Sequence, residues 1–162
     1  MAYEDADLLN HDIREGFNSD FMSKLVYVAA PFSAPTLGGI EENITTAKKL
    51  GRLLLQGSGS YPVVPHVMTA DMLDDNIPEE RDIALRMTMD VMLAVQKSDG
   101  FMVILVDKDG TTKSRGVAAE IARWKESDPG MEKMFFVTAD VLDGVEPMPE
   151  RFLSCPQCGY PD

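Results

Sequence analysis

The chain has 162 residues, of which 44% are hydrophobic and 26% charged, a composition typical of a single globular domain. Its formal net charge of -12, from 27 acidic and 15 basic side chains, disfavours binding to nucleic acid or to an anionic membrane surface. A small molecule is the expected ligand. An anionic nucleotide is compatible with this charge, because the start of a helix can bind a phosphate locally.

The sequence has no apolar run near the roughly 20 residues that a membrane span needs, and its first residues are acidic. Cys155 and Cys158 are its two cysteines, too few for a disulfide framework. We therefore expect a cytoplasmic protein.

The first third of the chain predicts a strand followed by a helix. Residues 1–23 show no clean periodicity and are expected to form an acidic extension. KLVYVAAPF at 24–32 is a continuous apolar run that ends near Pro31, as in a strand buried on both faces. Apolar residues at helical spacing follow a loop and predict a helix over 40–57, ended by Gly57.

The middle of the chain predicts a short strand and a long helix. YPVVPH at 61–66 is bracketed by prolines, so we expect a second strand that ends with His66 in a loop. Pro78 suits the first turn of a helix. The inner face of that helix is predicted to carry Ile83, Met87, Val91 and Ala94.

The last elements complete an alternating pattern. FMVILV at 101–106 predicts a third buried strand, 114–127 a third helix and 133–142 a fourth strand. Strands that alternate with helices at this spacing indicate an α/β fold with a doubly wound, mostly parallel sheet and helices on both faces. Ligands of such sheets bind at the carboxyl ends of the strands.

The start of the third predicted helix is a candidate anion site. Ser114 and Gly116 lie there, where backbone N-H groups and a hydroxyl converge, and Glu120 follows about one turn later. From spacing alone, Glu120 is either an exposed helix carboxylate behind an ordinary cap or a group directed at a ligand.

Four other side chains have both a structural and a functional interpretation. Asp90 belongs either to a solvated helix face or to a site, and Asp99 either to a turn or to a site. Tyr27 lies within the first strand, where an aromatic ring usually packs. His66 either caps a turn or contacts a ligand, and it does not form a metal site.

Several known motifs are absent. No glycine-rich dinucleotide or triphosphate motif and no serine hydrolase elbow is present, and we expect no cofactor. Cys155 and Cys158 form half of a zinc ribbon, so we predict a metal-free tail. The rival interpretation is a four-cysteine site shared by two chains.

Six segments recur in the order seen in a known family: YVAAPFS, Asn43 in the first helix, VVPH, Asp90, SDGFMVILV and SRGVAAEIARW. Together they resemble the nucleoside 2-deoxyribosyltransferase superfamily, most of all its small, largely uncharacterised branch from phages and bacteria. The resemblance covers about residues 24–125. It implies a flavodoxin-like fold that cleaves or exchanges the N-glycosidic bond of a nucleoside or nucleoside 5'-monophosphate.

The resemblance also implies catalytic roles. Glu120 matches the nucleophilic glutamate, which attacks the anomeric carbon and forms a glycosyl ester. Asp90 matches an acid that supplies a proton to the leaving base, and Tyr27 matches the tyrosine that holds the nucleophile. The residues implied to touch the substrate are Ser114, Arg115 and Gly116 at the sugar 5' oxygen or phosphate, Phe32 over the base, and Asn43, His66 and Asp99 at the rim.

The resemblance sets the expected organisation as an N-terminal extension at 1–23, a catalytic domain at 24–142 and a tail at 143–162. Subunits of the superfamily commonly pair, so we expect a homodimer. Two alternatives to an enzyme are a nucleotide-binding sensor without activity and a phage accessory protein that acts through its surface. The sequence leaves open which base is bound, whether the sugar is ribose or deoxyribose, and whether water or a second base is the acceptor.

Overall fold

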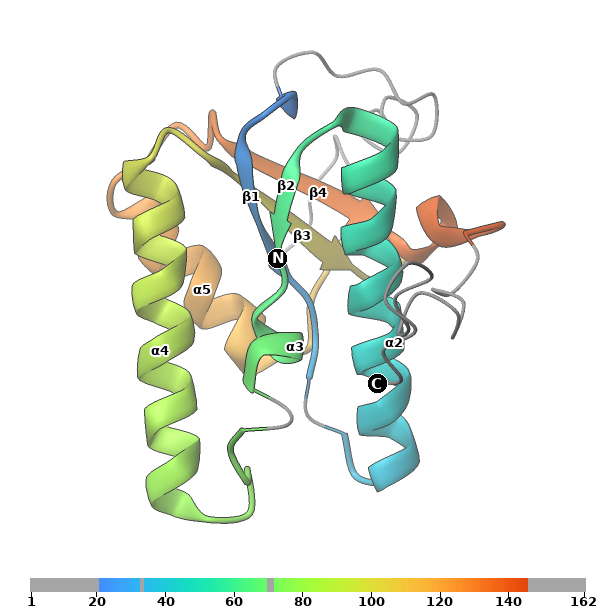
Figure 1. Cartoon of the computed structure of the whole chain (residues 1–162), viewed down its shortest axis with the longest axis vertical. Helices are drawn as coiled ribbons and strands as arrows, with labels where there is room; N and C mark the ends of the chain where they lie inside the picture. Colours follow the sequence, from blue (N-terminus) through green and yellow to red (C-terminus); the bar gives the residue numbers. More distant parts are fainter. Residues whose placement is uncertain (1–20, 33, 70–71, 146–162) are drawn as a thin grey trace, which may run out of the picture.

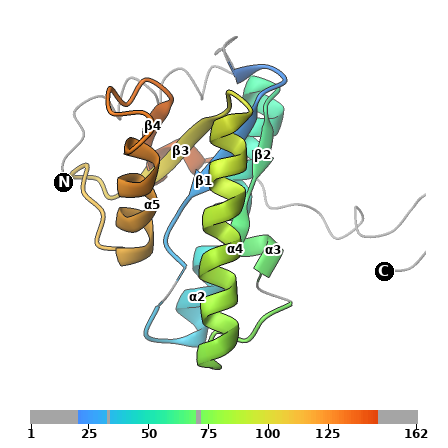
Figure 2. The same cartoon turned by 90° about the vertical axis from the view of Figure 1, so that its left-hand side faces the viewer.

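The computed structural model describes residues 21–32, 34–69 and 72–145, which form one parallel four-stranded sheet with the order β2-β1-β3-β4. The strands are β1 (Leu25–Ala29), β2 (Tyr61–Val63), β3 (Phe101–Val106) and β4 (Met134–Thr138). Helix α2 (Leu37–Leu53) covers one face, while α4 (Pro78–Lys97) and α5 (Arg115–Lys125) cover the other (Figures 1 and 2). This arrangement confirms the predicted flavodoxin-like, doubly wound sheet.

The central strands are buried on both faces, and alternation along β1 decides which side chain meets which helix. Val26 and Val28 pack with residues of α2, whereas Tyr27 and Ala29 pack with residues of α4 and α5. All six residues of β3 are buried. The hydroxyl of Tyr27 is therefore directed to the α4 and α5 side of the sheet.

The helical run formed by α2 and the turn after it starts earlier and ends later than the predicted range of 40–57. The Thr36 side chain accepts a hydrogen bond from Gly39 N at 3.1 Å and caps the helix, which starts at Leu37. A wider helical turn, η2 (Leu54–Ser58), continues it. The helical run passes through Gly57 and ends at Gly59, whose φ of 67° is the left-handed conformation that favours glycine.

His66 lies in a short helix, not in the predicted loop. Helix α3 (Pro65–Thr69) begins directly after β2 with Pro65, a residue suited to a first helical position. The helix places His66 next to the carboxyl end of β1.

The inner face of α4 differs from the prediction. Met92 and Val95 are buried against the sheet, whereas Ile83 is 44% exposed. The predicted stripe lies along a separate shallow depression, lined by Ile83, Arg86, Met87, Asp90, Val91 and Ala94. The first turns of α4 extend past the strand ends, so only the later turns have a sheet to pack on (Figures 1 and 2).

The packed domain begins before residue 24, its predicted first residue. Phe21 is fully buried, with its ring 4.6 Å from that of Phe101 and 5.0 Å from that of Phe135. Residues 1–20 of the predicted extension and 146–162 of the predicted tail, with Cys155 and Cys158, lie outside the described residues. Among the helices that are described, none combines the length and apolar character needed to cross a membrane.

Candidate functional site

A cavity of about 1080 Å³ opens at the carboxyl ends of β1 and β3. Its walls come from the segment after β1, helix α3, the first half of α4, the loop after β3 and the start of α5. The chain leaves β1 and β3 toward opposite faces of the sheet, so a crevice forms between these strands. The fold therefore places the cavity where ligands of such sheets bind.

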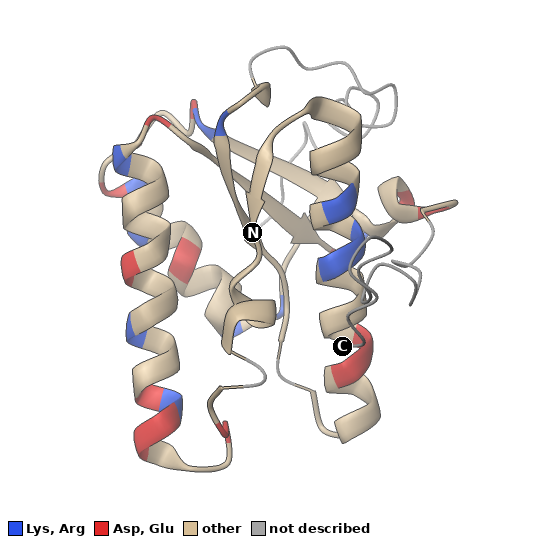
Figure 3. Ribbon diagram, viewed as in Figure 1, with Lys and Arg blue, Asp and Glu red and all other residues tan. Residues whose placement is uncertain are grey.

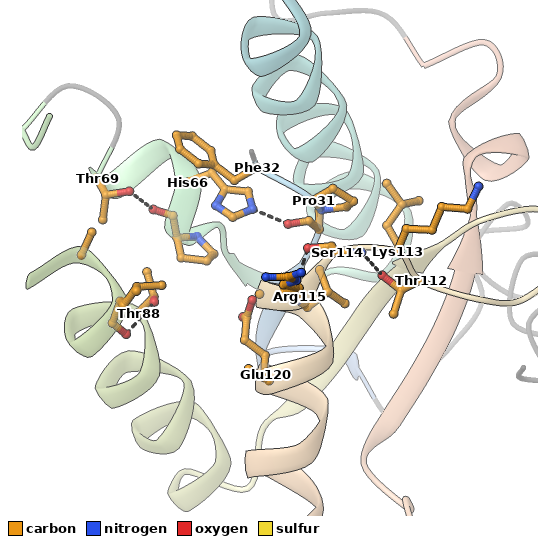
Figure 4. Close-up of a pocket in the computed structure, with 18 of the residues that line it drawn as sticks. Pro31, Phe32, His66, Thr69, Thr88, Thr112, Lys113, Ser114, Arg115 and Glu120 are labelled. Carbon is orange, nitrogen blue, oxygen red and sulfur yellow. Dashed lines mark hydrogen bonds between the residues drawn. The ribbon is translucent and has the colours of Figure 1, made fainter. Parts of the chain in front are cut away.

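Glu120 projects from α5 into this cavity (Figure 4). The side chain is half-buried, and its Oε2 atom is buried without a hydrogen-bond partner. Burial raises the pKa of Glu120 from 4.5 to about 7, and the nearby Tyr27 hydroxyl opposes that rise. Of the two interpretations left open by the sequence, the structure favours a carboxylate directed at a ligand.

Tyr27 brings its hydroxyl to the same cavity from β1. The side chain is fully buried, and burial, followed by the Glu120 carboxylate, raises its pKa above the ordinary range. The two groups are close enough to influence each other's pKa, but no hydrogen bond of ordinary geometry is made by the hydroxyl or by Glu120 Oε2. Two adjacent buried polar atoms without partners are typical of a site that a ligand completes.

The start of α5 forms the other polar wall. Ser114 Oγ accepts a hydrogen bond from Val117 N at 3.2 Å, and Ser114 N donates to Thr112 Oγ1 at 3.2 Å. The backbone N-H groups of Arg115 and Gly116 come first in the helix and have no place in its internal ladder. A Cβ on Gly116 would have only Ser114 Oγ, at 3.8 Å, as a close neighbour. This wall is open to an anion.

The wall at the start of α5 carries cations, and the loop after β3 carries both signs of charge. Lys108, Lys113 and Arg115 are exposed and line the cavity. Elsewhere both signs alternate over the helices, with acidic residues at the start of α4 and a lysine at its end (Figure 3). Asp107 and Asp109 line the same cavity, so a favourable place for an anionic group is confined to the start of α5, beside Lys113 and Arg115.

The segment after β1 is held from two sides. The His66 Nε2 atom hydrogen-bonds to the carbonyl oxygen of Ala30, and Asn43 Nδ2 donates to the carbonyl oxygen of Phe32 at 3.0 Å. The rings of Phe32 and His66 lie 5.0 Å apart (Figure 4). Burial lowers the pKa of His66, and the hydrogen bond to Ala30 partly opposes this change. The lowered pKa favours the neutral ring at neutral pH. Phe32 and His66 both line the cavity.

Asn43 has a different place from the one predicted. It lines a smaller neighbouring cavity of about 250 Å³ instead of the main one. The geometry assigns it a supporting role, in which its side-chain amide fixes the backbone that carries Phe32.

We expect Asn43→Ala to weaken ligand binding without unfolding the protein. Loss of one hydrogen bond to a carbonyl costs about 0.5 to 1.5 kcal/mol and loosens the Phe32 segment. Urea denaturation measures the loss of stability. The KM of a nucleotide that the protein uses as a substrate measures the loss of binding. Thr45→Ala is the matched control, since that exposed hydroxyl bonds only within α2, to Glu41 O. Equal ligand affinity in both variants would contradict the supporting role.

Asp90 is not part of the main cavity. It is exposed on α4 and faces the shallow depression on the outer side of that helix. Asp90 and the cavity-lining Thr88 are two positions apart, and two helical positions turn a side chain by about 200°. A single chain therefore does not bring Asp90 together with Glu120.

Asp99 lies at the opposite end of the sheet, so its predicted place at the rim of the site is wrong. Its carboxylate pairs with Lys24 at 3.1 Å and Lys133 at 3.3 Å, the residues just before β1 and β4. The hydrogen bonds to Lys24 and then Lys133 lower its pKa. It adopts a left-handed φ of 64° before Gly100, where an added Cβ would approach Leu25 O to 2.5 Å. Asp99 is a turn residue.

Several residues that line the cavity were not predicted from the sequence. Arg81, Ala84, Leu85 and Thr88 of α4 line the cavity, and their spacing marks one face of a helix. That signal was present, but the apolar stripe on another face of the helix was stronger. Among the described residues, no cluster of three or more His, Cys, Asp or Glu side chains suits a metal ion.

The raised pKa of Glu120 predicts that the free energy of unfolding depends on pH. Between pH 4.5 and about 7 the folded chain keeps a proton that the unfolded chain has lost, so stability falls as pH rises through this window. Glu120→Gln removes this effect and should be more stable than wild type at about pH 8, by on the order of 1 to 3 kcal/mol. The two proteins should converge near pH 4.

Chemical denaturation across this pH range measures the difference. Glu41→Gln, which removes an exposed carboxylate of α2, is the control and should show no such pH-dependent gain. If Glu120→Gln gains no more stability than the control above pH 7, the carboxylate is not buried as described.

Fold and site together define an α/β protein with a flavodoxin-like sheet and, facing a cavity at the strand ends, a buried tyrosine and a glutamate with one buried carboxylate oxygen. Residues 24–133 match the family described as Domain of unknown function (DUF7768), and the chain belongs to that family. No curated protein and no solved structure gives a significant match.

Proposed function

We propose that the protein cleaves or exchanges the N-glycosidic bond of a nucleoside or nucleoside 5'-monophosphate, with Glu120 as nucleophile. The observation that carries this proposal is the buried, unpartnered Oε2 of Glu120 at the cavity wall, beside the Tyr27 hydroxyl. The ordered motifs shared with the nucleoside 2-deoxyribosyltransferase superfamily also support it.

The proposed reaction has two displacements. Glu120 attacks the anomeric carbon, the bond from that carbon to the base nitrogen breaks, the departing base takes its electron pair and a proton from water in the cavity, and a glycosyl ester forms on the carboxylate. Water or the ring nitrogen of a second base then attacks the same carbon, loses its proton to solvent and releases the Glu120 carboxylate. Glu120 must be ionised to attack, so the rate should rise with pH through about 7.

The cavity also offers groups that would hold such a substrate. A 5'-phosphate would accept hydrogen bonds from the first N-H groups of α5 and the Ser114 hydroxyl, with Lys113 and Arg115 nearby. The ring of Phe32 beside His66 would contact the base. The cavity of about 1080 Å³ has room for a nucleotide.

Base release from a panel of nucleosides and nucleoside 5'-monophosphates tests the proposal. Ribose and deoxyribose forms of each base are incubated with the protein, alone and with a second free base, and products are separated by chromatography. Release in water identifies a hydrolase, and a new nucleoside identifies a transferase. The absence of base release and exchange across the panel would contradict the proposal.

A second candidate function is a nucleotide-binding sensor that lacks the reaction. It is favoured by the position of Asp90, since the acid expected to protonate the leaving base faces away from the cavity. Calorimetric binding of a nucleotide without base release would support this function.

We further propose that the protein is a cytoplasmic homodimer, as the resemblance to the superfamily implies. Analytical ultracentrifugation tests the dimer.

A further inference from the structure

The His66 ring is fixed to the backbone at one edge. Helix α3 begins directly after β2 and carries His66 to the cavity, where its ring lies 5.0 Å from that of Phe32 (Figure 4). Its Nε2 atom hydrogen-bonds to the carbonyl oxygen of Ala30. The two nitrogens of an imidazole lie on different edges of the ring, so Nδ1 is directed away from that carbonyl.

The hydrogen bond to Ala30 determines which ring nitrogen carries the proton. A carbonyl oxygen has lone pairs and no proton, so Nε2 must be the donor in this bond. A neutral imidazole has a single N-H, and donation by one nitrogen leaves the other as an acceptor. The Nδ1 atom of neutral His66 therefore carries a lone pair and can only accept.

The Nδ1 atom is accessible and has no protein partner. Within the described part of the chain, the Ala30 bond is the hydrogen bond that the His66 ring makes. The buried side-chain atoms without a partner belong to Tyr27, Arg52 and Glu120, so Nδ1 is not one of them. An unpartnered atom outside that group has exposed surface. Because His66 lines the cavity, this edge of the ring is available to a ligand.

A lone pair at this position restricts what a ligand can place there. A phosphate oxygen or a carbonyl oxygen would repel it, whereas an N-H or O-H group would bind it. The start of α5 offers the opposite chemistry, with N-H donors and cations suited to a phosphate. The acceptor edge of His66 lies beside Phe32, the ring that is proposed to contact the base.

We infer that His66 selects a nucleobase with an exocyclic amino group, whose N-H donates to Nδ1 while the Phe32 ring contacts the base. This inference deepens the proposed function and rests on it. The amino group of cytosine or adenine projects from the ring as a donor, whereas thymine presents an oxygen acceptor at the corresponding place. That oxygen would face the Nδ1 lone pair.

Nitrogen NMR tests the ring without turnover. The chain has two histidines, so His11→Gln leaves His66 as the single source of imidazole signals. Well above the ordinary histidine pKa of about 6.5, we expect a protonated Nε2 and a bare Nδ1. A 5'-monophosphate with an amino-bearing base should shift the Nδ1 signal as hydrogen bonding does, and its analogue without the amino group should not. A protonated Nδ1 in the free protein, or an unmoved signal with every amino-bearing nucleotide, would overturn the inference.

Matched pairs of nucleotides test the selection itself. Each pair differs by one amino group: adenine with purine, guanine with hypoxanthine, and cytosine with pyrimidin-2-one. Wild type should bind the amino-bearing member of its preferred pair roughly three- to tenfold more tightly, the contribution of one hydrogen bond. Calorimetry measures the dissociation constants, and kcat/KM measures the same preference where a base is released.

His66→Phe keeps an aromatic ring beside Phe32 and removes Nδ1, so it should abolish this preference. Loss of the Ala30 bond alone would weaken both members of a pair equally and leave the preference unchanged. Val67→Ala is the control, because Val67 is an exposed neighbour on α3 that does not line the cavity. An unchanged preference in His66→Phe would overturn the inference, and the NMR test on the unaltered ring decides it should that variant fail to fold.

The outcomes separate the selection by His66 from the proposed reaction. A binding preference that is lost in His66→Phe, without base release by wild type, would count against the proposed function and not against His66. Base release without a preference for amino-bearing bases would retain the proposed function and overturn the role of His66.

Discussion

Glu120→Gln should lose at least about a thousandfold in base release, because an amide keeps the shape of the side chain but cannot form the glycosyl ester. The fold should remain, since Glu120 Oε2 makes no hydrogen bond that the substitution would break. Activity and thermal unfolding are measured on the same preparation. The expected pairing is a lost reaction and an unchanged or raised melting temperature.

Two comparisons make this result specific. Glu41→Gln removes an exposed carboxylate of α2 that does not line the cavity, and should keep full activity. Rapid quenching of wild type with substrate should trap a glycosyl group on Glu120, identified by mass spectrometry of the peptide. Wild-type turnover in Glu120→Gln would remove Glu120 from the reaction, and a trapped adduct elsewhere would name a different nucleophile.

The fold was predictable because each part of the pattern is local. Continuous apolar runs such as FMVILV occur where a strand is covered on both faces, and intervening helical spacing forces parallel crossovers. Given that topology, the segments after β1 and β3 must meet at one edge of the sheet. Glu120 and Ser114 reach the cavity for this reason, and the rule needs no knowledge of side-chain packing.

The choice between residues of one helix was not predictable in the same way. Asp90 and Thr88 are close in sequence, yet only Thr88 faces the cavity, because the packing of Met92 and Val95 sets the rotation of α4. The helix carries apolar residues on more than one face, so its sequence does not show which face the sheet covers. An acidic residue was then assigned to the site on resemblance alone.

Asp99 and Phe21 show two further limits. Asp99 lies two residues before β3, and parallel strands all start at the edge opposite the site, so topology alone excluded it. Phe21 belongs to a segment without periodicity, yet its ring packs with Phe101 and Phe135. A single aromatic residue that fills a gap between strands leaves no repeating signal in the sequence.

The protein should prefer a nucleoside 5'-monophosphate to the corresponding free nucleoside by roughly ten- to a hundredfold in kcat/KM. The physical reason is the wall formed by Ser114, Arg115 and Gly116, where first-turn N-H groups and side chains meet a dianionic phosphate. Each charge-assisted hydrogen bond contributes about 1.5 to 3 kcal/mol, and about 1.4 kcal/mol corresponds to tenfold. Lys113 and Arg115 are exposed, and salt screens exposed charges, so we expect contributions at the lower end of this range.

Substitution at the two ends of α5 separates this local effect from the charge of the whole protein. Arg115→Met should lower kcat/KM for the monophosphate and leave the free nucleoside nearly unchanged, because only the phosphate reaches the start of the helix. Lys125→Met removes one positive charge at the far end of the same helix and should change neither value. The preference for the monophosphate should also shrink as salt is added. Salt shortens the distance over which exposed charges interact, which is about 8 Å at physiological ionic strength. Equal kcat/KM for both substrates in wild type, or equal losses in the two variants, would place the phosphate elsewhere and leave the start of α5 as an ordinary helix cap.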